Sequence, residues 1–281
     1  MEQFNVCRET ENTGSVKEDI NSIKREGPFP EPMSISILTA SLNEVQNIEF
    51  WLKGISEIYV ENKLKFIREI IIVDDGSIDG TVQKVLAIME NYPIKIKLIQ
   101  RDRKMGTLNA QIFGASFCDS DYLLIMDCDL QHPIKFIPKL IEQLEKKPDI
   151  VIGSRYTEGG INKWNPFRGL VSRVATFIAH IMIKQSRNVS DPLSGYFVVK
   201  SPLIRGLIPY EGMYKPLLYI ISMHEKLKVF EFPVSMEERL SGESKIVQNP
   251  LKTIIRYLRE VLVFWINSRK RHSKRFDGDQ S

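Results

Sequence analysis

Two acidic clusters follow apolar segments of the chain, and their residue types are suited to binding a metal ion. Asp127 and Asp129 come directly after the apolar run at residues 122–126, and Gln131 continues the spacing of two. Residues two apart in an extended chain point the same way, so two carboxylates and one amide oxygen would converge. Such hard oxygen ligands suit Mg²⁺ or Mn²⁺, and magnesium commonly takes its remaining ligands from water and substrate phosphates. Carboxylates simply solvated in a loop are the other interpretation, but the second acidic cluster favours a metal site.

That second cluster is Asp74-Asp75, which follows the Ile-rich run at residues 69–73. Directly after a buried strand, these two carboxylates are suited to hydrogen bonds with a ribose or a base. A turn that leads into a helix is the alternative, with Ser77 or Asp79 as the capping residue. We expect the turn role for Asp79 and a ligand role for Asp74 and Asp75.

The elements that must position these clusters alternate between strand and helix patterns. Apolar runs predict strands over residues 34–40, 69–73, 94–99, 122–126 and 149–153, and amphipathic segments predict helices over 45–59, 81–90, 108–117 and 134–146. Strands alternating with helices indicate an α/β fold with a mostly parallel, Rossmann-like sheet flanked by helices. Beyond residue 153 only residues 228–236 have a clear strand pattern. Ligands of open α/β sheets bind outside the carboxyl ends of the strands, so we expect one shared site.

Composition divides the chain into three segments and excludes several classes of protein. The 281 residues carry a net charge of +4, with nine basic and three acidic residues in 245–281. We expect a flexible N-terminal arm over 1–32, a single domain over 33–245, and an amphipathic helix with a basic tail over 246–281. Three cysteines without a CxxC pair favour a reducing compartment. Neither a signal-peptide pattern nor an apolar run of the ~20 residues that span a bilayer is evident.

The C-terminal segment carries an apolar stripe at helical spacing, followed by basic residues. The stripe consists of Leu251, Ile254, Ile255, Leu258, Val261, Leu262 and Trp265, and basic residues dominate 269–275. One interpretation is a helix packed on the domain with a solvated tail. The other is an interfacial helix with a basic patch that is attracted to anionic lipid headgroups. The basic run lacks a recognisable nucleic-acid-binding module, so we expect no nucleic-acid partner.

Seven short motifs follow one another along the chain. They are Leu42-Asn43-Glu44, Asp74-Asp75-Gly76-Ser77, the segment 127–133, Gly153-Ser154-Arg155-Tyr156, Arg168 with Ser172-Arg173, the segment 191–197, and Arg239 with Gly242-Glu243-Ser244-Lys245. Together and in this order, they resemble the family-2 inverting glycosyltransferases of GT-A fold. Within that family the chain looks most like the dolichyl-phosphate mannosyltransferases, also called polyprenyl-phosphate-mannose synthases.

The resemblance implies a role for each matching residue. The nucleotide would be bound by Glu44, Asp74, Asp75, Arg101, Lys104 and Asp127, and the metal by Asp127, Asp129 and Gln131. Asp129, Arg155 and Arg239 would be catalytic, and the acceptor phosphate would be bound by Arg155, Arg168, Ser172, Arg173 and Lys245. Arginine suits the last task because its guanidinium binds phosphate through two hydrogen bonds.

The implied activity is transfer of mannose from GDP-mannose to dolichyl or another polyprenyl phosphate, with Mg²⁺ or Mn²⁺ as cofactor. A polyprenyl phosphate is already an anion, so its attack needs charge complementarity and positioning instead of a general base. Two alternatives remain open: a UDP-sugar donor of the glucose type, and a non-catalytic, lipid-binding relative. We expect a peripheral protein at the cytoplasmic face of a membrane, where a small membrane-anchoring partner is possible.

Overall fold

The structure, a computed structural model, describes residues 7–9, 33–62, 64–162, 166–236 and 250–278 of the chain. An eight-stranded sheet in the order β1-β4-β3-β2-β5-β8-β6-β9 forms its centre. Its strands are β1 (Cys7–Glu9), β2 (Ile35–Ser41), β3 (Ile67–Asp74), β4 (Lys95–Gln100), β5 (Tyr122–Ile125), β6 (Ile150–Ser154), β8 (Phe197–Lys200) and β9 (Val229–Pro233). Strands β7 (Ile161–Asn162) and β10 (Ser235–Met236) form a separate parallel pair.

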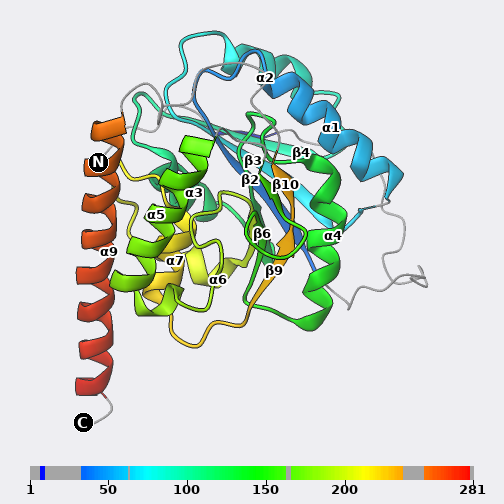
Figure 1. Cartoon of the computed structure of the whole chain (residues 1–281). Coiled ribbons are helices and arrows are strands. Elements are labelled where there is room, and N and C mark those ends of the chain that lie inside the picture. Colours follow the sequence, from blue (N-terminus) through cyan, green and yellow to red (C-terminus); the bar gives the residue numbers. More distant parts are fainter. Residues whose placement is uncertain (1–6, 10–32, 63, 163–165, 237–249, 279–281) are drawn as a thin grey trace.

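Helices cover both faces of the sheet (Figure 1). Those on one face are α1 (Ile48–Glu61), α2 (Thr81–Met89) and α4 (Ile137–Glu142), the last flanked by the 3₁₀ turns η1 (Ile134–Phe136) and η2 (Gln143–Lys146). On the other face lie α3 (Thr107–Ala115), α5 (Pro166–Met182), η3 (Lys184–Ser186), α6 (Ser201–Ile204), α7 (Pro216–Met223) and α9 (Pro250–Gly278). The expected α/β fold with a mostly parallel sheet flanked by helices is confirmed.

Strand β3 illustrates why the apolar runs are continuous. Ile70 and Ile72 pack into the core under α1 and α2, whereas Ile71 and Val73 pack into the core under α3 and α7. Because alternate side chains point to opposite faces, a strand covered on both faces must be apolar at every position. Strand β2 runs parallel to both of its neighbours, β3 and β5. The residues that follow these three strands therefore lie at one edge of the sheet.

Strand β8 is one of the elements that the sequence pattern missed. It is antiparallel to both of its neighbours, β5 and β6, so it interrupts the parallel order in the middle of the sheet. Its insertion brings the residues before Phe197 back to the carboxyl ends of β5 and β6. The segment 191–196 therefore lies beside the acidic loop that follows β5.

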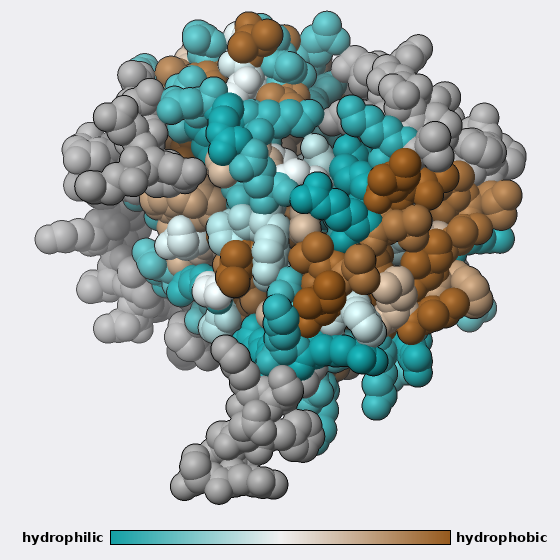
Figure 2. Space-filling model, turned by 90° about the vertical axis from the view of Figure 1, so that its left-hand side faces the viewer, coloured by the Kyte–Doolittle hydropathy of each residue, from teal (hydrophilic) through white to brown (hydrophobic). Residues whose placement is uncertain are grey.

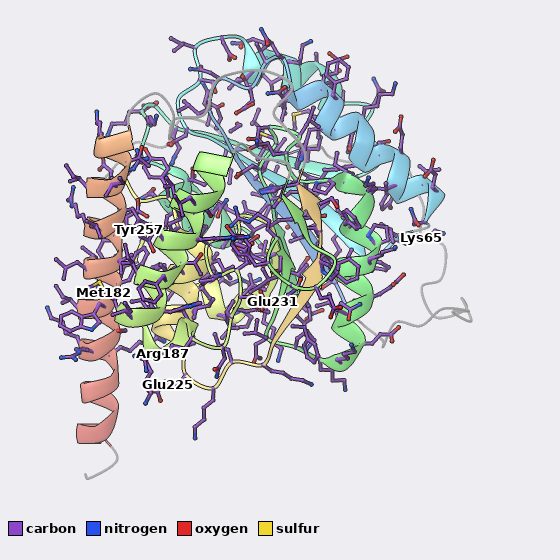
Figure 3. All side chains as sticks on the ribbon, in the orientation of Figure 1. Lys65, Met182, Arg187, Glu225, Glu231 and Tyr257 are labelled. Carbon is purple, nitrogen blue, oxygen red and sulfur yellow. The ribbon has the colours of Figure 1, made fainter. Side chains whose placement is uncertain are left out.

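Helix α9 is integrated into the core on the second face. Val261 and Phe264 are fully buried there, and the Phe264 ring stacks on Tyr219 of α7 with 4.9 Å between centroids. The Tyr257 hydroxyl of α9, labelled in Figure 3, donates a hydrogen bond to the Ala175 carbonyl of α5 at 2.5 Å. Within the described part of the chain, none of the helices combines the length and the apolar character needed to cross a bilayer.

Candidate functional site

A pocket of about 100 Å³ opens at the carboxyl ends of β2, β3 and β5, where the sequence predicted a shared site. Its walls come from the three strand ends, from the loop that precedes α3, and from the loop that precedes α7. The lining residues are Ala40, Ser41, Leu42, Glu44, Asp75, Lys104, Gly106, Thr107, Asp127, Cys128, Asp129 and Tyr214. Four carboxylates thus share one small cavity with the ammonium group of Lys104. Such a cavity is suited to a metal ion together with a phosphorylated ligand.

The loop after β5 is held in a strained conformation that orients its acidic residues. Leu130 has a φ of +63°, in the left-handed region that a bulky residue rarely adopts. The backbone N–H of Asp127 donates to Nδ1 of His132 at 2.8 Å, and the backbone N–H of Gln131 donates to Oδ1 of Asp129 at 3.1 Å. The His132 ring stacks on Tyr196 with 5.2 Å between centroids. His132 therefore holds the backbone of Asp127 in place while its own ring packs against Tyr196.

Negative charge is concentrated around Cys128, which lies between the two acidic residues of this loop. Burial raises the pKa of the Cys128 thiol well above its ordinary value, and the charges of Glu44, Asp129 and Asp127 raise it further. In the described part of the chain, groups of three His, Cys, Asp or Glu side chains arranged to enclose a metal are absent. Two carboxylates with an amide beside them suit a cation that takes its other ligands from a substrate. The donor set fits Mg²⁺ or Mn²⁺ in that way.

Asp75 organises the pocket wall that contains Lys104. Its carboxylate accepts hydrogen bonds from the backbone N–H groups of Met105 and Gly106, both at 2.8 Å, and pairs with the guanidinium of Arg101. Arg101 is buried and also donates to Oδ1 of Asn109 at 2.5 Å. Gly106 has a φ of +100°, and a Cβ there would lie 3.1 Å from the Met213 carbonyl oxygen. Asp75 and Arg101 thus shape the wall, and nucleotide binding by either stays a prediction.

Asp74 is fully buried behind the pocket. It accepts hydrogen bonds from the N–H and the hydroxyl of Ser77, at 2.8 and 2.5 Å, and from the hydroxyl of Ser41 at 3.2 Å. These bonds stabilise the turn after β3 and tie it to the end of β2. Asp74 is not among the residues that line the described pocket, so its predicted contact with a nucleotide stays untested.

Glu44 reaches the pocket from a loop that is fastened to the turn after β3. Its backbone N–H donates to the Thr81 hydroxyl at 2.9 Å, and its carboxylate accepts from the Asn47 side-chain amide at 2.7 Å. The backbone N–H of Val45 donates to the Asp79 carboxylate at 3.1 Å. That carboxylate also accepts from the backbone N–H of Thr81 at 3.0 Å, so the turn role expected for Asp79 has a geometric basis.

Arg155 at the end of β6 forms a buried ion pair with Asp191. Its Nε and Nη2 donate to the two carboxylate oxygens at 2.7 and 2.5 Å, and its backbone N–H adds a third bond at 3.1 Å. Burial acts to lower the pKa of Arg155, but the charge and hydrogen bonds of Asp191 outweigh it and raise the pKa. The backbone of Asp191 is itself held by Glu231 of β9, which is labelled in Figure 3. The guanidinium predicted to bind the acceptor phosphate is thus also a structural partner of Asp191.

The other residues predicted for the acceptor lie away from the pocket or outside the described residues. Helix α5 carries Ser172, partly exposed, and Arg173, exposed, and neither lines the pocket. Arg168 is on the same helix, with a side chain outside the described atoms, and Arg239 and Lys245 fall in the segment 237–249, which the structure does not describe. The acceptor role of Arg168, Ser172, Arg173 and Lys245 stays a prediction, and so does the catalytic role of Arg239.

Three residues that sequence reasoning missed join this site: Tyr214, Lys215 and Glu260. Tyr214 lines the pocket, and its backbone N–H donates to Oε2 of Glu260 on α9 at 3.1 Å. Burial raises the pKa of Glu260 to about 7, although the Tyr214 hydrogen bond and the charges of Lys215 and Arg256 oppose the rise. The sequence did contain a signal for Glu260. It is an acidic residue at helical spacing from Tyr257 and Phe264, so it shares the apolar face of α9 that is buried.

Comparison with known proteins gives consistent results. The pattern of the family described as Glycosyl transferase family 2 matches residues 36–205. A dolichol-phosphate mannosyltransferase of Pyrococcus furiosus is 35% identical over 231 residues, which cover 82% of this chain and 63% of that protein. One from Saccharomyces cerevisiae is 31% identical over 206 residues, covering 70% of this chain and 75% of that protein. This chain therefore spans less than two thirds of the archaeal relative.

Among solved structures, glucosyl-3-phosphoglycerate synthase from Mycobacterium tuberculosis resembles the fold. The crystal structure with Mn²⁺, uridine diphosphate and glucosyl-3-phosphoglycerate superposes with a TM-score of 0.62, covering 84% of this chain and 80% of that one. The sequence identity is 18%, so this likeness concerns the fold alone.

Proposed function

The chain belongs to glycosyl transferase family 2, and on that premise we propose that it transfers mannose from GDP-mannose to dolichyl or another polyprenyl phosphate. The observation that carries the proposal is the convergence of Glu44, Asp75, Asp127 and Asp129 on one pocket at the ends of parallel strands. The relatives named dolichol-phosphate mannosyltransferase in an archaeon and in yeast support the choice of sugar and acceptor.

The metal in this proposal is Mg²⁺ or Mn²⁺, held by Asp127, Asp129 and Gln131. When bound, it supplies Lewis-acid stabilisation of the leaving diphosphate. Glu44 and Asp75 line the pocket in which the nucleotide would bind, and Lys104 would add positive charge there. Asp74 and Arg101 contribute by holding the walls that carry those groups.

The transfer itself requires one bond to form and one to break. An oxygen of the polyprenyl phosphate attacks C1 of mannose, and the bond from C1 to the β-phosphate oxygen breaks, so GDP leaves with the electron pair and C1 is inverted. The attacking oxygen is already anionic, and no side chain has to remove a proton. The cations predicted to bind it are Arg155, Arg168, Arg173 and Lys245, with Ser172 as a hydrogen-bond donor, and Arg239 is predicted to be catalytic.

A membrane surface is the proposed place of the reaction, because the acceptor is a lipid. Helices α5 and α9 pack side by side and expose one apolar patch, which consists of Leu170, Val174, Phe177, Ile181, Ile254, Ile255, Leu258, Leu262 and Ile266. Figure 2 shows hydrophobic side chains gathered on this side of the molecule. Exposed basic side chains of α9, including Lys252, Arg259 and Lys270, complement anionic headgroups. The cytoplasmic face of that membrane remains a prediction from the sequence.

Transfer assays test the activity. The protein is incubated with Mn²⁺, a short polyprenyl phosphate and a panel of GDP- and UDP-sugars, and the lipid products are analysed by mass spectrometry. We expect product from GDP-mannose, its loss with EDTA, and its loss in Asp129→Ala but not in the control Asp119→Asn, an exposed carboxylate. Product from UDP-glucose alone would instead favour the UDP-sugar alternative, and none from any donor would favour a non-catalytic relative.

Liposome flotation tests the membrane proposal. Phe177→Glu and Ile255→Glu place charges in the apolar patch, and both should reduce binding to vesicles that contain anionic lipid. Val60→Glu, a matched change on exposed α1, should leave binding unaltered. Equal flotation of all variants would refute the patch as a membrane surface. Binding that needs a second, membrane-anchored protein would instead point to a small anchoring partner.

A further inference from the structure

The loop over residues 210–215 connects the pocket with helix α9. On the pocket side, the N–H of Gly212 donates to the Met105 carbonyl at 2.7 Å, and the N–H of Leu108 donates to the Met213 carbonyl at 3.0 Å. These bonds fasten the loop to the same wall that Asp75 organises and that contains Lys104. A displacement of the loop would therefore change the pocket.

On the other side, the loop is held by a buried carboxylate of α9. Glu260 is 2% exposed and accepts hydrogen bonds from the backbone N–H groups of both Tyr214 and Lys215. The Arg256 guanidinium lies over the Tyr214 ring at 4.2 Å from its centroid. One turn of α9 thus fixes the two loop residues nearest the pocket.

Lys215 lies where the metal carboxylates and the Arg155–Asp191 pair approach each other. Its ammonium group interacts electrostatically with Glu260, Arg155, Asp191 and Asp127. These four groups come from α9, β6, the segment before β8 and the loop after β5. The ammonium is therefore near the centre of the site.

The ammonium group of Lys215 makes no hydrogen bond or ion pair to any other residue that the structure describes. Lysines with a structural role in this protein are different: Lys97 pairs with Glu69 at 2.9 Å, and Lys200 pairs with Asp149 at 2.8 Å. Lys215 is only partly exposed, so its charge has lost part of its hydration without gaining a hydrogen bond to another described side chain. A partly desolvated cation beside Asp127 is suited to an anionic ligand.

We propose that Lys215 binds the diphosphate of the nucleotide sugar, and that Glu260 is the positioning residue that presents it. This inference rests on the proposed function, because it assumes a nucleotide-diphosphate ligand. Lys215 directly precedes α7, and its ammonium group interacts with Asp127, one of the carboxylates proposed to hold the metal. It thereby offsets the charge that accumulates on the leaving diphosphate. Helix α9, which also contributes to the apolar patch, is then part of the donor site.

Titration calorimetry with GDP or UDP in the presence of Mn²⁺ tests the proposal without requiring transfer. Lys215→Met should weaken binding of the diphosphate that the wild-type protein prefers by roughly 10- to 100-fold, the range of a charge-assisted hydrogen bond. Lys215→Arg should restore part of the affinity. Binding of the matching nucleoside monophosphate should change much less.

At pH 8, above the raised pKa of Glu260, Glu260→Gln should weaken diphosphate binding by roughly 3- to 10-fold, because the Gln side chain still accepts a hydrogen bond but no longer carries the charge beside Lys215. Tyr257→Phe is the control: it removes a hydrogen bond of the same helix to α5 and should leave binding unchanged. Thermal melting of every variant separates a loss of binding from a loss of folding.

The two proposals fail separately. Wild-type diphosphate affinity in a folded Lys215→Met variant would overturn the role of Lys215, even if mannose is transferred. An equal loss of monophosphate and diphosphate binding in Lys215→Met would also overturn it, since the lysine would then make no specific contribution to binding the diphosphate. If UDP binds and Lys215→Met abolishes the binding, the inference stands while the GDP-mannose donor is wrong.

Discussion

The buried Arg155–Asp191 pair makes a prediction that separates folding from catalysis. The two side chains are 7% and 0% exposed, and three hydrogen bonds connect the two residues. Asp191→Ala leaves the Arg155 guanidinium buried without its carboxylate, and breaking such a pair costs about 3–5 kcal/mol. For a chain of this size that corresponds to a fall of roughly 6–20 °C in Tm.

Removing both charges should be less harmful than removing either one. Arg155→Met leaves Asp191 without a cation, but the double variant Arg155→Met/Asp191→Leu leaves no uncompensated charge and keeps most of the buried volume. We expect its loss of stability to be smaller than the sum of the single losses by about 2 kcal/mol or more, the coupling typical of contacting residues. Urea denaturation, read by circular dichroism, measures the four corners of the cycle: wild type, Arg155→Met, Asp191→Leu and the double variant.

A loss below about 1 kcal/mol in Asp191→Ala would refute this reasoning, because a buried guanidinium cannot lose its counter-charge at so small a cost. The same variants test the acceptor role of Arg155. A folded double variant that binds the donor but transfers no sugar would support phosphate binding by Arg155. A folded double variant with wild-type transfer would show that the arginine serves only Asp191.

Three further predictions concern single residues of the site. Glu260 has a pKa raised to about 7 in the folded protein against an ordinary value of 4.5, so between these two pH values the folded state binds a proton that the unfolded state has lost. The contribution of this proton to stability is full below about pH 4.5 and is lost as pH rises through 7. The total loss is at most about 3 kcal/mol. Lys215 and Arg256 face this carboxyl, and Glu260→Gln should flatten the fall, with a higher Tm than wild type at pH 8 and an equal one at pH 4.5; parallel pH profiles would contradict the assignment. Gly106→Ala should weaken nucleotide binding at least tenfold, measured by calorimetry, because the new Cβ meets a backbone carbonyl at 3.1 Å in a left-handed conformation; unchanged affinity would mean that the wall yields. Cys128, buried with a raised pKa, should resist iodoacetamide at pH 8 until the protein is unfolded in urea, as read by peptide mass spectrometry, and rapid native labelling would contradict that burial.

The first half of the fold was predictable because its strands are buried on both faces and its helices are amphipathic. Residues 122–125 are apolar at every position, so their strand follows from composition alone. Strand β8 is equally short, and its apolar run Phe197-Val198-Val199 was not among the expected strands. Its antiparallel pairing depends on β5 and β6, which are distant in sequence, and local patterns do not encode that contact.

The acidic half of the site was predictable for a topological reason. Parallel neighbouring strands end at the same edge, so the residues after β3 and β5 must meet, and Asp75, Asp127 and Asp129 do line one pocket. The partner of a charged residue is a different matter. Asp191 lies 36 residues from Arg155, and its approach depends on β8, the strand that the pattern missed. The arginines predicted to bind the acceptor phosphate therefore included Arg155, which forms an ion pair with Asp191 in the structure.

Helix α9 shows why the two interpretations of the C-terminal segment are compatible. The stripe read from the sequence included Val261, which is fully buried, and Ile255 and Leu258, which are exposed, because apolar side chains extend around more than one face of the helix. The buried face packs on α7 through Phe264 and holds the pocket loop through Glu260, while the exposed face joins α5 in the apolar patch. A helix packed by large buried side chains cannot shift without disturbing what it contacts. A membrane surface engaged by α9 would therefore contact the same helix that holds Tyr214 and Lys215. The membrane and the loop of the donor pocket would then contact opposite faces of one helix.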